Sequence, residues 1–284
     1  MTAAARAGAR RWRRWVGWSV LFLLTAAAVA ALLAYRSARA DPVVRQIAVA
    51  LPGWPAGAAP VRVLLWSDLH LGDRATDADR LERLVAQANA LQPDLVVLAG
   101  DYVAGHERAD AAVAPGLRAL RGLAAPAVAV MGNHEYWTDA PRVRRALEAA
   151  GVTVLANSAV RRGALAVGGV DDMVNARDDV GATAAAMRRV GGAPVMVSHS
   201  PDIARALPGD VPLLVAGHTH CGQIVLPFYG PPVEVSEPRY RCGVVRDRGR
   251  LVVVTAGTGT SVVPLRFDAP PDWWLLTLSG GRTR

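Results

Sequence analysis

The chain has 284 residues, of which 52% are apolar, and its formal net charge is +8. This length allows one large hydrophobic core or two small ones. The first 40 residues hold seven Arg and no acid, which leaves 25 Arg against 24 acids in the remainder. A strongly basic chain would suggest nucleic-acid binding, but the nearly neutral remainder removes that indication, and we expect no nucleic-acid partner.

The basic leader contains a stretch that can cross a membrane. Residues 16–35 form an uncharged run of 20, the length a helix needs to span a bilayer. Five Arg precede the run and two follow it, which predicts a cytoplasmic N-terminus, a single pass through the inner (cytoplasmic) membrane and a domain on the outer, periplasmic face. Because Ala38-Arg39-Ala40 also fits a cleavage site, residues 1–40 are either an anchor or a signal peptide. Both alternatives export residues 41–284, the expected catalytic domain.

The exported part alternates short apolar runs with helical patterns. Strands are predicted at residues 61–66, 94–98, 127–130, 152–155, 165–170, 195–198, 213–216, 251–256 and 273–278. Helices are predicted at residues 76–91, 109–123 and 142–150. Strands separated by helices, followed by more consecutive strands, indicate an α/β (α+β) domain.

Polar side chains follow five of these predicted strands directly. They are Asp68 and His70, Asp101, Asn133 and His134, His199, and finally His218 and His220. Because ligand sites in open α/β sheets gather at the carboxyl ends of the strands, we expect these segments to converge. Five of the six His lie in them, which scattered structural histidines would not do. A Gly precedes Asp101, Asn133 and His218, and we expect it to permit a tight turn.

The residue types in this set predict a metal centre. Asp, His and Asn without Cys suit divalent ions such as Mn, Fe or Zn. The predicted ligands are Asp68, His70, Asp101, Asn133, His199, His218 and His220. They are too many for one ion and suit two ions that share a carboxylate. Two ions roughly 3.5–4 Å apart can clamp the attacking and leaving oxygens of a phosphoryl displacement.

The same segments resemble the five ordered motifs of the calcineurin-like metallophosphoesterases. The resemblance covers about residues 61–278. Within the family, the motif sequences look like those of a bacterial membrane-associated branch, which includes phosphodiesterases and UDP-2,3-diacylglucosamine pyrophosphatase-like enzymes. It implies a four-layer β-sandwich flanked by helices. It also implies hydrolysis of a phosphodiester or pyrophosphate bond by a metal-bridging hydroxide.

The resemblance further implies a role for each candidate residue. Asp68, His70 and His220 would hold one metal, and Asn133, His199 and His218 the other. Asp101 would bridge the two ions. His134 would protonate the leaving oxygen or stabilise charge on the phosphoryl group. Many relatives carry an Asp that orients this His, but Ala104 stands at that position here, so His134 has another partner or none.

Several alternatives stay open at this level. The tether favours a lipid-linked or envelope phosphoester, with a pyrophosphatase-like enzyme of lipid A synthesis and a non-catalytic metal-binding scaffold as alternatives. Cys221 and Cys242 form one disulfide or remain two free thiols. Tyr136 and Trp137 are a candidate substrate-facing pair, and His106 is either a phosphate contact or a solvated loop residue. The oligomeric state is unknown.

Overall fold

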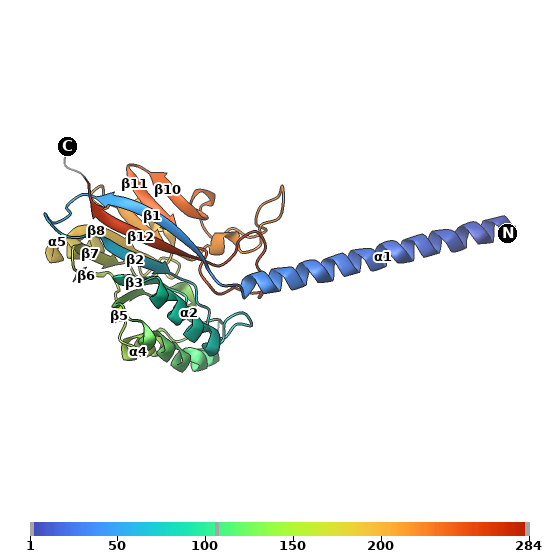
Figure 1. The fold of residues 1–284 in the computed structure, drawn as a ribbon, viewed down its shortest axis with the longest axis horizontal. Helices are drawn as coiled ribbons and strands as arrows, with labels where there is room; N and C mark the ends of the chain where they lie inside the picture. Colours follow the sequence, from blue (N-terminus) through green and yellow to red (C-terminus); the bar gives the residue numbers. More distant parts are fainter. Residues whose placement is uncertain (1–2, 106–107, 282–284) are drawn as a thin grey trace.

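The computed structural model describes residues 3–105 and 108–281, which form one long helix and a layered domain (Figure 1). Helix α1 (Ala3–Ala38) extends away from the domain. From Arg10 to Ala38 it is long and apolar enough to cross a membrane, and its most apolar stretch is not buried in the domain. The expected membrane-spanning helix is therefore present as a structural element.

The first sheet combines strands from both ends of the chain. Its order is β1-β12-β2-β3-β4-β5. The strands are β1 (Val43–Leu51), β2 (Val61–Trp66), β3 (Leu95–Ala99), β4 (Ala127–Val130), β5 (Thr153–Val154) and β12 (Asp272–Gly280). Strands β2 to β5 run parallel, whereas β12 is antiparallel to β2 and parallel to β1. The carboxyl ends of β2, β3 and β4 therefore share one edge.

The second sheet has a parallel centre and antiparallel edges. Its order is β10-β11-β9-β8-β7-β6. The strands are β6 (Ser158–Arg162), β7 (Leu165–Gly169), β8 (Ala193–Val197), β9 (Leu213–Ala216), β10 (Gly243–Asp247) and β11 (Arg250–Val254). Strands β7, β8, β9 and β11 run parallel. Strands β6 and β10 pair antiparallel at the two edges.

Helices cover the outer face of each sheet and complete four layers. Helices α2 (Ala78–Ala90), η1 (Arg108–Gly122) and α4 (Ala140–Ala149) cover the first sheet. Helices α5 (Val180–Val190) and η2 (Pro201–Ala206) cover the second. Three short helices lie in loops: α3 (Asn133–Trp137), η3 (His220–Gly222) and η4 (Pro238–Tyr240). The predicted sandwich flanked by helices is confirmed.

Burial on both faces explains why the central strands are continuously apolar. In β3, Leu95 and Val97 pack between the two sheets, whereas Val96 and Leu98 pack against the helices. A strand with two buried faces has no position for an alternating polar residue. The same packing accounts for the predicted strands along the centre of both sheets.

Among the elements that were not predicted, which include strands β6 and β10, strand β1 and helix α5 owe their stability to distant partners. Strand β1 pairs along its whole length with β12, at the other end of the chain. Helix α5 contains Gly181 and β-branched residues, which lower helix propensity. Its apolar face is buried against the second sheet, and this packing outweighs the propensity.

Candidate metal centre

The five predicted polar segments meet at the edge where the parallel strands end. Backbone hydrogen bonds join neighbouring segments: the Asp68 N–H donates to the Gly100 carbonyl at 3.0 Å, and the Gly217 N–H donates to the His199 carbonyl at 3.0 Å. The first bond links β2 to β3, and the second links β8 to β9. The side chains that follow these strands are therefore held within one small volume.

The backbone of this edge adopts an unusual conformation. Five candidate residues have φ in the left-handed region, between +44° and +72°: Asp68, His70, Asp101, His218 and His220. A non-glycine residue in this region costs of order 1 kcal/mol or more and persists only where the surroundings enforce it. Such positions cluster at functional sites, where they aim side chains that an extended backbone would turn away.

Glycine is required in these segments for two different reasons, a positive φ angle and a lack of space for a β-carbon. Gly100 has φ +92°, a conformation that favours glycine. A β-carbon on Gly132 would instead collide with the Asp101 carboxylate, and one on Gly217 would collide with Ser67 and Asp68. The expected turn conformation thus applies to Gly100, and all three glycines allow neighbouring segments to approach closely, since a β-carbon on Gly100 would lie 2.6 Å from Nδ1 of His199.

Asp68, His70 and His220 form the first group of donor atoms. All three side chains are buried, and their donor atoms lie within 4.8 Å of one another. The Nε2 atoms of the two histidines are 3.1 Å apart, and Oδ1 of Asp68 is 3.4 Å from Nε2 of His220. The three donors therefore converge on one point.

Asp101, His199 and His218 form the second group. Nε2 of His199 lies 3.2 Å from Oδ2 of Asp101, 3.1 Å from Nδ1 of His218 and 3.1 Å from Oδ1 of Asn133. Nδ1 of His199 is 2.7 Å from the Ala99 carbonyl and donates to it, which leaves Nε2 as the atom with a free lone pair when the ring is neutral. Asn133 thus belongs to this group.

Asp101 lies between the two groups. Its Oδ2 atom is 3.6 Å from Nε2 of His70 in the first group and 3.2 Å from Nε2 of His199 in the second. Its other oxygen, Oδ1, accepts the backbone N–H of His134 at 3.1 Å. One carboxylate oxygen is therefore anchored, and the other is directed between the groups.

Burial sets the protonation of most of these side chains. It lowers the pKa of His70 and His220 well below the usual range and lowers the pKa of His218 to about 3. These rings are neutral and keep a lone pair at physiological pH. Burial also lowers the pKa of His199, but the Asp101 and Asp68 carboxylates outweigh it and raise the pKa of that ring to about 10.

The donor set fits divalent cations. Oδ1 of Asp68 is fully buried among the described residues without a hydrogen-bond partner, and burial raises the pKa of this carboxyl to about 7. A buried carboxylate oxygen without a partner is costly unless a cation satisfies it. Neutral imidazoles, carboxylates and an amide oxygen are ligands that first-row divalent metals accept.

His134 lies beside the two groups and has a backbone partner. Its Nδ1 atom is 2.9 Å from the Gly105 carbonyl, and its Nε2 atom is 3.9 Å from Oδ2 of Asp101. The carbonyl therefore orients the ring in place of the carboxylate that Ala104 cannot supply. Of the two alternatives for this residue, the described structure supports another partner.

Residues 61–222 match the calcineurin-like phosphoesterase family. The chain belongs to this family. The resemblance drawn from the motifs is confirmed, and the protein is a metallophosphoesterase, a phosphoesterase hydrolase.

Relatives of the metallophosphoesterase come from bacteria and animals. The uncharacterized metallophosphoesterase YkuE of Bacillus subtilis (strain 168) is 31% identical over 79% of this chain and 81% of its own length. The phosphodiesterase YaeI of Escherichia coli (strain K12) is 29% identical over 78% of this chain and 83% of its own. A "transmembrane protein with metallophosphoesterase domain" of Danio rerio is 27% identical over 84% of this chain and 58% of its own.

Two buried charged residues of the metallophosphoesterase support the centre without having been predicted. Glu135 accepts the backbone N–H groups of Asp101 at 3.0 Å, Tyr102 at 2.7 Å and Gly132 at 2.8 Å. Burial and then the Asp101 charge raise the pKa of Glu135 to about 8. The guanidinium of Arg266 donates to the carbonyls of loop 256–269 and lies 3.3 Å from Nδ1 of His220.

Only one of these two residues carried a signal in the sequence. Glu135 lies in the same segment as Asn133 and His134, so its neighbourhood indicated a link to the site. Arg266 is one of many Arg and has no motif around it. Its role follows solely from its complete burial beside the candidate ligand His220.

The cysteine alternatives are resolved in favour of a disulfide. Cys221 and Cys242 are bonded, with a Cα–Cα distance of 4.7 Å. The bond ties the residue after His220 to the end of a long loop that also carries η4. His106 lies outside the described residues.

A cleft of about 460 Å³ opens over the candidate metal centre. Asp101, His134 and His218 line its polar end, together with Asn133 and His220. Apolar side chains that also line the cleft form its apolar wall: Ile224, Pro232, Val233, Val235, Val262 and Val263. The cleft thus joins a polar reaction site to an apolar wall.

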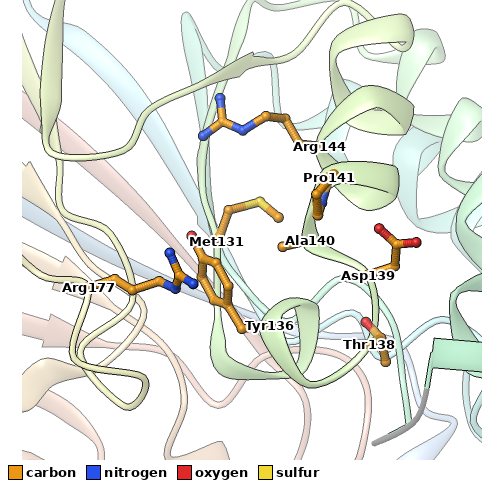
Figure 2. Close-up of a pocket in the computed structure, with 8 residues that line it drawn as sticks. All are labelled: Met131, Tyr136, Thr138, Asp139, Ala140, Pro141, Arg144 and Arg177. Carbon is orange, nitrogen blue, oxygen red and sulfur yellow. The ribbon is translucent and has the colours of Figure 1, made fainter.

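The Tyr136–Trp137 pair is divided between two cavities. Trp137 lines the cleft, and its ring lies 5.0 Å from that of His134. Tyr136 lines a separate cavity of about 530 Å³, where it donates to Asp171 and stacks under Arg177. Figure 2 shows Arg144 on the far side of this cavity from the Tyr136 ring. Only Trp137 therefore lies at the candidate reaction site.

Proposed function

We propose that the metallophosphoesterase hydrolyses a phosphodiester or pyrophosphate bond with two divalent ions, each of them Mn, Fe or Zn. The observation that carries this proposal is the pair of buried donor groups with the Asp101 carboxylate directed between them. Asp68, His70 and His220 would hold one ion, and Asn133, His199 and His218 the other, with Asp101 shared. When bound, the ions supply Lewis-acid polarisation of the phosphoryl oxygens and a water of lowered pKa.

The protein's own residues orient the reaction. We assign His134 as the group that donates a proton to the leaving oxygen or stabilises charge on the phosphoryl group. The Gly105 carbonyl accepts from Nδ1, which leaves Nε2 as the atom that faces the centre. Glu135 accepts four backbone N–H groups and thereby holds the Asp101 and Asn133 segments together. All eight candidate side chains are chemically competent, which argues against the scaffold alternative.

The proposed substrate is a lipid-linked or envelope phosphoester. Donor groups and apolar side chains line the same cleft, which suits a molecule with both a phosphoester and an apolar part. The apolar helix, with residues 1–40 as its anchor segment and 41–284 as the catalytic domain, would keep the enzyme beside such molecules. The Danio rerio relative is likewise described as a transmembrane protein.

We further propose that the domain faces the outer, periplasmic side of the inner membrane. The Arg excess before the span supports a cytoplasmic N-terminus. The Cys221–Cys242 disulfide also supports this orientation, because such bonds persist in oxidising compartments. The same bond weighs against the enzyme of lipid A synthesis, whose nucleotide-linked lipids are made on the cytoplasmic side.

The test is metal-dependent turnover by the full chain in detergent. The metal is removed with a chelator, Mn, Fe or Zn is restored, and hydrolysis of bis-p-nitrophenyl phosphate is measured. We expect two bound ions per chain and a loss of about 10³-fold in Asp101→Ala, because the variant removes the shared ligand. Asp178→Ala, an exposed carboxylate, is the matched control. Wild-type protein that binds no metal, or an Asp101→Ala variant with full turnover, would disprove the proposal.

A further inference from the structure

Exposed apolar side chains gather on two loops beside the cleft. We define them as the apolar rim: Leu226, Phe228, Tyr229, Val233, Val235, Val262, Val263 and Phe267. Phe228 is fully exposed, and Val262 is 89% exposed. The two loops are joined, since the Val225 N–H donates to the Phe267 carbonyl at 2.9 Å. Single exposed apolar residues are ordinary, but a group on adjoining loops marks a contact surface. Glu234 is the one acid within segments 226–235 and 262–267, and it is paired with Arg241.

The apolar rim is attached directly to the end of helix α1. The Arg266 N–H donates to the Ala34 carbonyl at 3.0 Å, and the Phe267 N–H donates to the Gln223 carbonyl at 2.9 Å. The side chain of Ala38 is completely buried against the domain. These contacts connect both loops of the rim to the last turns of the helix.

The attachment leaves no flexible linker between the helix and the rim. Helix α1 continues without a break to Ala38, while its uncharged stretch ends at Tyr35. Twenty helical residues extend about 30 Å, which equals the hydrocarbon thickness of a bilayer. The domain therefore contacts the helix at the level where the helix leaves the hydrocarbon. Figure 1 shows the orange loop of residues 224–236 extending from the domain on the same side as α1.

We propose that the apolar rim docks into the interfacial layer of the bilayer that α1 crosses. Phe228 and Tyr229 would sit among the lipid headgroups, where aromatic side chains are favoured. Four valines belong both to the rim and to the cleft wall: Val233, Val235, Val262 and Val263. Docking of the rim would therefore place the cleft next to the membrane surface. This inference rests on the proposed membrane span and not on the proposed catalysis.

The test measures the depth of spin labels on the full chain in lipid nanodiscs of phosphatidylethanolamine and phosphatidylglycerol. Both native cysteines are paired, so a nitroxide attaches only to an introduced thiol. Labels are placed at Phe228→Cys and, as a second site, at Tyr229→Cys. Arg189→Cys is the control, because Arg189 is exposed on α5, which lies at the end of the domain opposite α1 (Figure 1). Collisions with oxygen, which enriches in lipid, are compared with collisions with a nickel chelate, which stays in water.

We expect oxygen collisions to exceed nickel collisions at positions 228 and 229, and the opposite sign at position 189. Nickel accessibility at 228 and 229 equal to that at 189 would overturn the proposal. Low accessibility to both reagents with dipolar coupling between labels would instead assign the rim to a second copy of the chain, and would overturn it as well. The readout needs no turnover, so an inactive protein that docks would contradict only the proposed function.

Discussion

The candidate metal centre and the apolar rim are built on opposite principles. The centre consists of buried polar residues at strand ends, held by backbone hydrogen bonds and enforced left-handed conformations. The rim consists of exposed apolar residues on loops, held by hydrogen bonds between the loops, by their attachment to α1 and by the disulfide. The strand ends thus place the donor side chains, whereas the loops determine which molecules can enter the cleft.

Breaking the covalent link between the two regions should have the largest effect. The Cys221–Cys242 bond closes a loop with a sequence separation of 21 residues. Cys242→Ser should lower the free energy of unfolding by about 3 kcal/mol, because the unfolded chain gains the freedom of that loop. Thermal unfolding of both proteins with and without reductant measures it. Reductant should destabilise only the wild type, and equal unfolding temperatures under all conditions would contradict the prediction.

Glu135→Gln should weaken the centre and leave the rim unchanged. The amide offers an N–H group where the carboxylate accepts backbone N–H groups, so the Asp101 and Asn133 segments lose their common partner. Replacing such a supporting residue typically lowers metal affinity or turnover about 10- to 100-fold. Metal titration and kcat/KM measure the loss, with the exposed Glu148→Gln as control. An unchanged metal affinity together with unchanged kcat/KM would refute this role.

Metal affinity of the centre should rise with pH. In the metal-free protein, carboxylates raise the pKa of His199 to about 10 despite burial, so near neutral pH a metal must displace its proton. The competition weakens as pH rises, which predicts about a tenfold gain in affinity per pH unit from this group. His70, His218 and His220 are already neutral and add nothing, whereas burial raises the pKa of Asp68 to about 7, so this carboxyl steepens the dependence at the acid end of the range. Metal titrations between pH 6.5 and 8.5 test this, and a flat profile would contradict it.

Val235→Thr should change the cleft wall and leave the metal centre intact. The substitution keeps the side-chain shape but adds a hydroxyl on the apolar wall. We expect the KM of a p-nitrophenyl phosphodiester with an acyl chain to rise about fivefold, which corresponds to about 1 kcal/mol of lost apolar contact. The KM of bis-p-nitrophenyl phosphate provides the comparison. Equal changes for both substrates would mean that the wall does not recognise the apolar part.

Much of the candidate site could be predicted from the sequence because each strand and the polar residues after it lie in one short segment. The predicted strands 61–66, 127–130 and 213–216 coincide with β2, β4 and β9. The polar residues follow those strands by two to four positions, and strand ends gather at one edge in any parallel sheet. Helix 109–123 was placed correctly but is a 3₁₀ helix, a difference that apolar spacing does not reveal.

Features that depend on contacts between residues far apart in the chain could not be predicted from the sequence. The orientation of His134 depends on the Gly105 carbonyl, 29 positions away in the chain. The assignment of Trp137 to the cleft and of Tyr136 to another cavity depends on the turn of a short helix. Strand β1 exists because β12 returns from the far end of the chain to pair with it.

The sequence by itself therefore determined the fold class, the family, the apolar helix and the eight candidate residues, because apolar periodicity and motif chemistry are properties of short segments. Only the tertiary structure decided that Asp101 lies between two donor groups, that the two cysteines pair, and that the apolar rim adjoins the end of α1. These outcomes arise from contacts between residues far apart in the chain. Such contacts exist only once both sheets have packed.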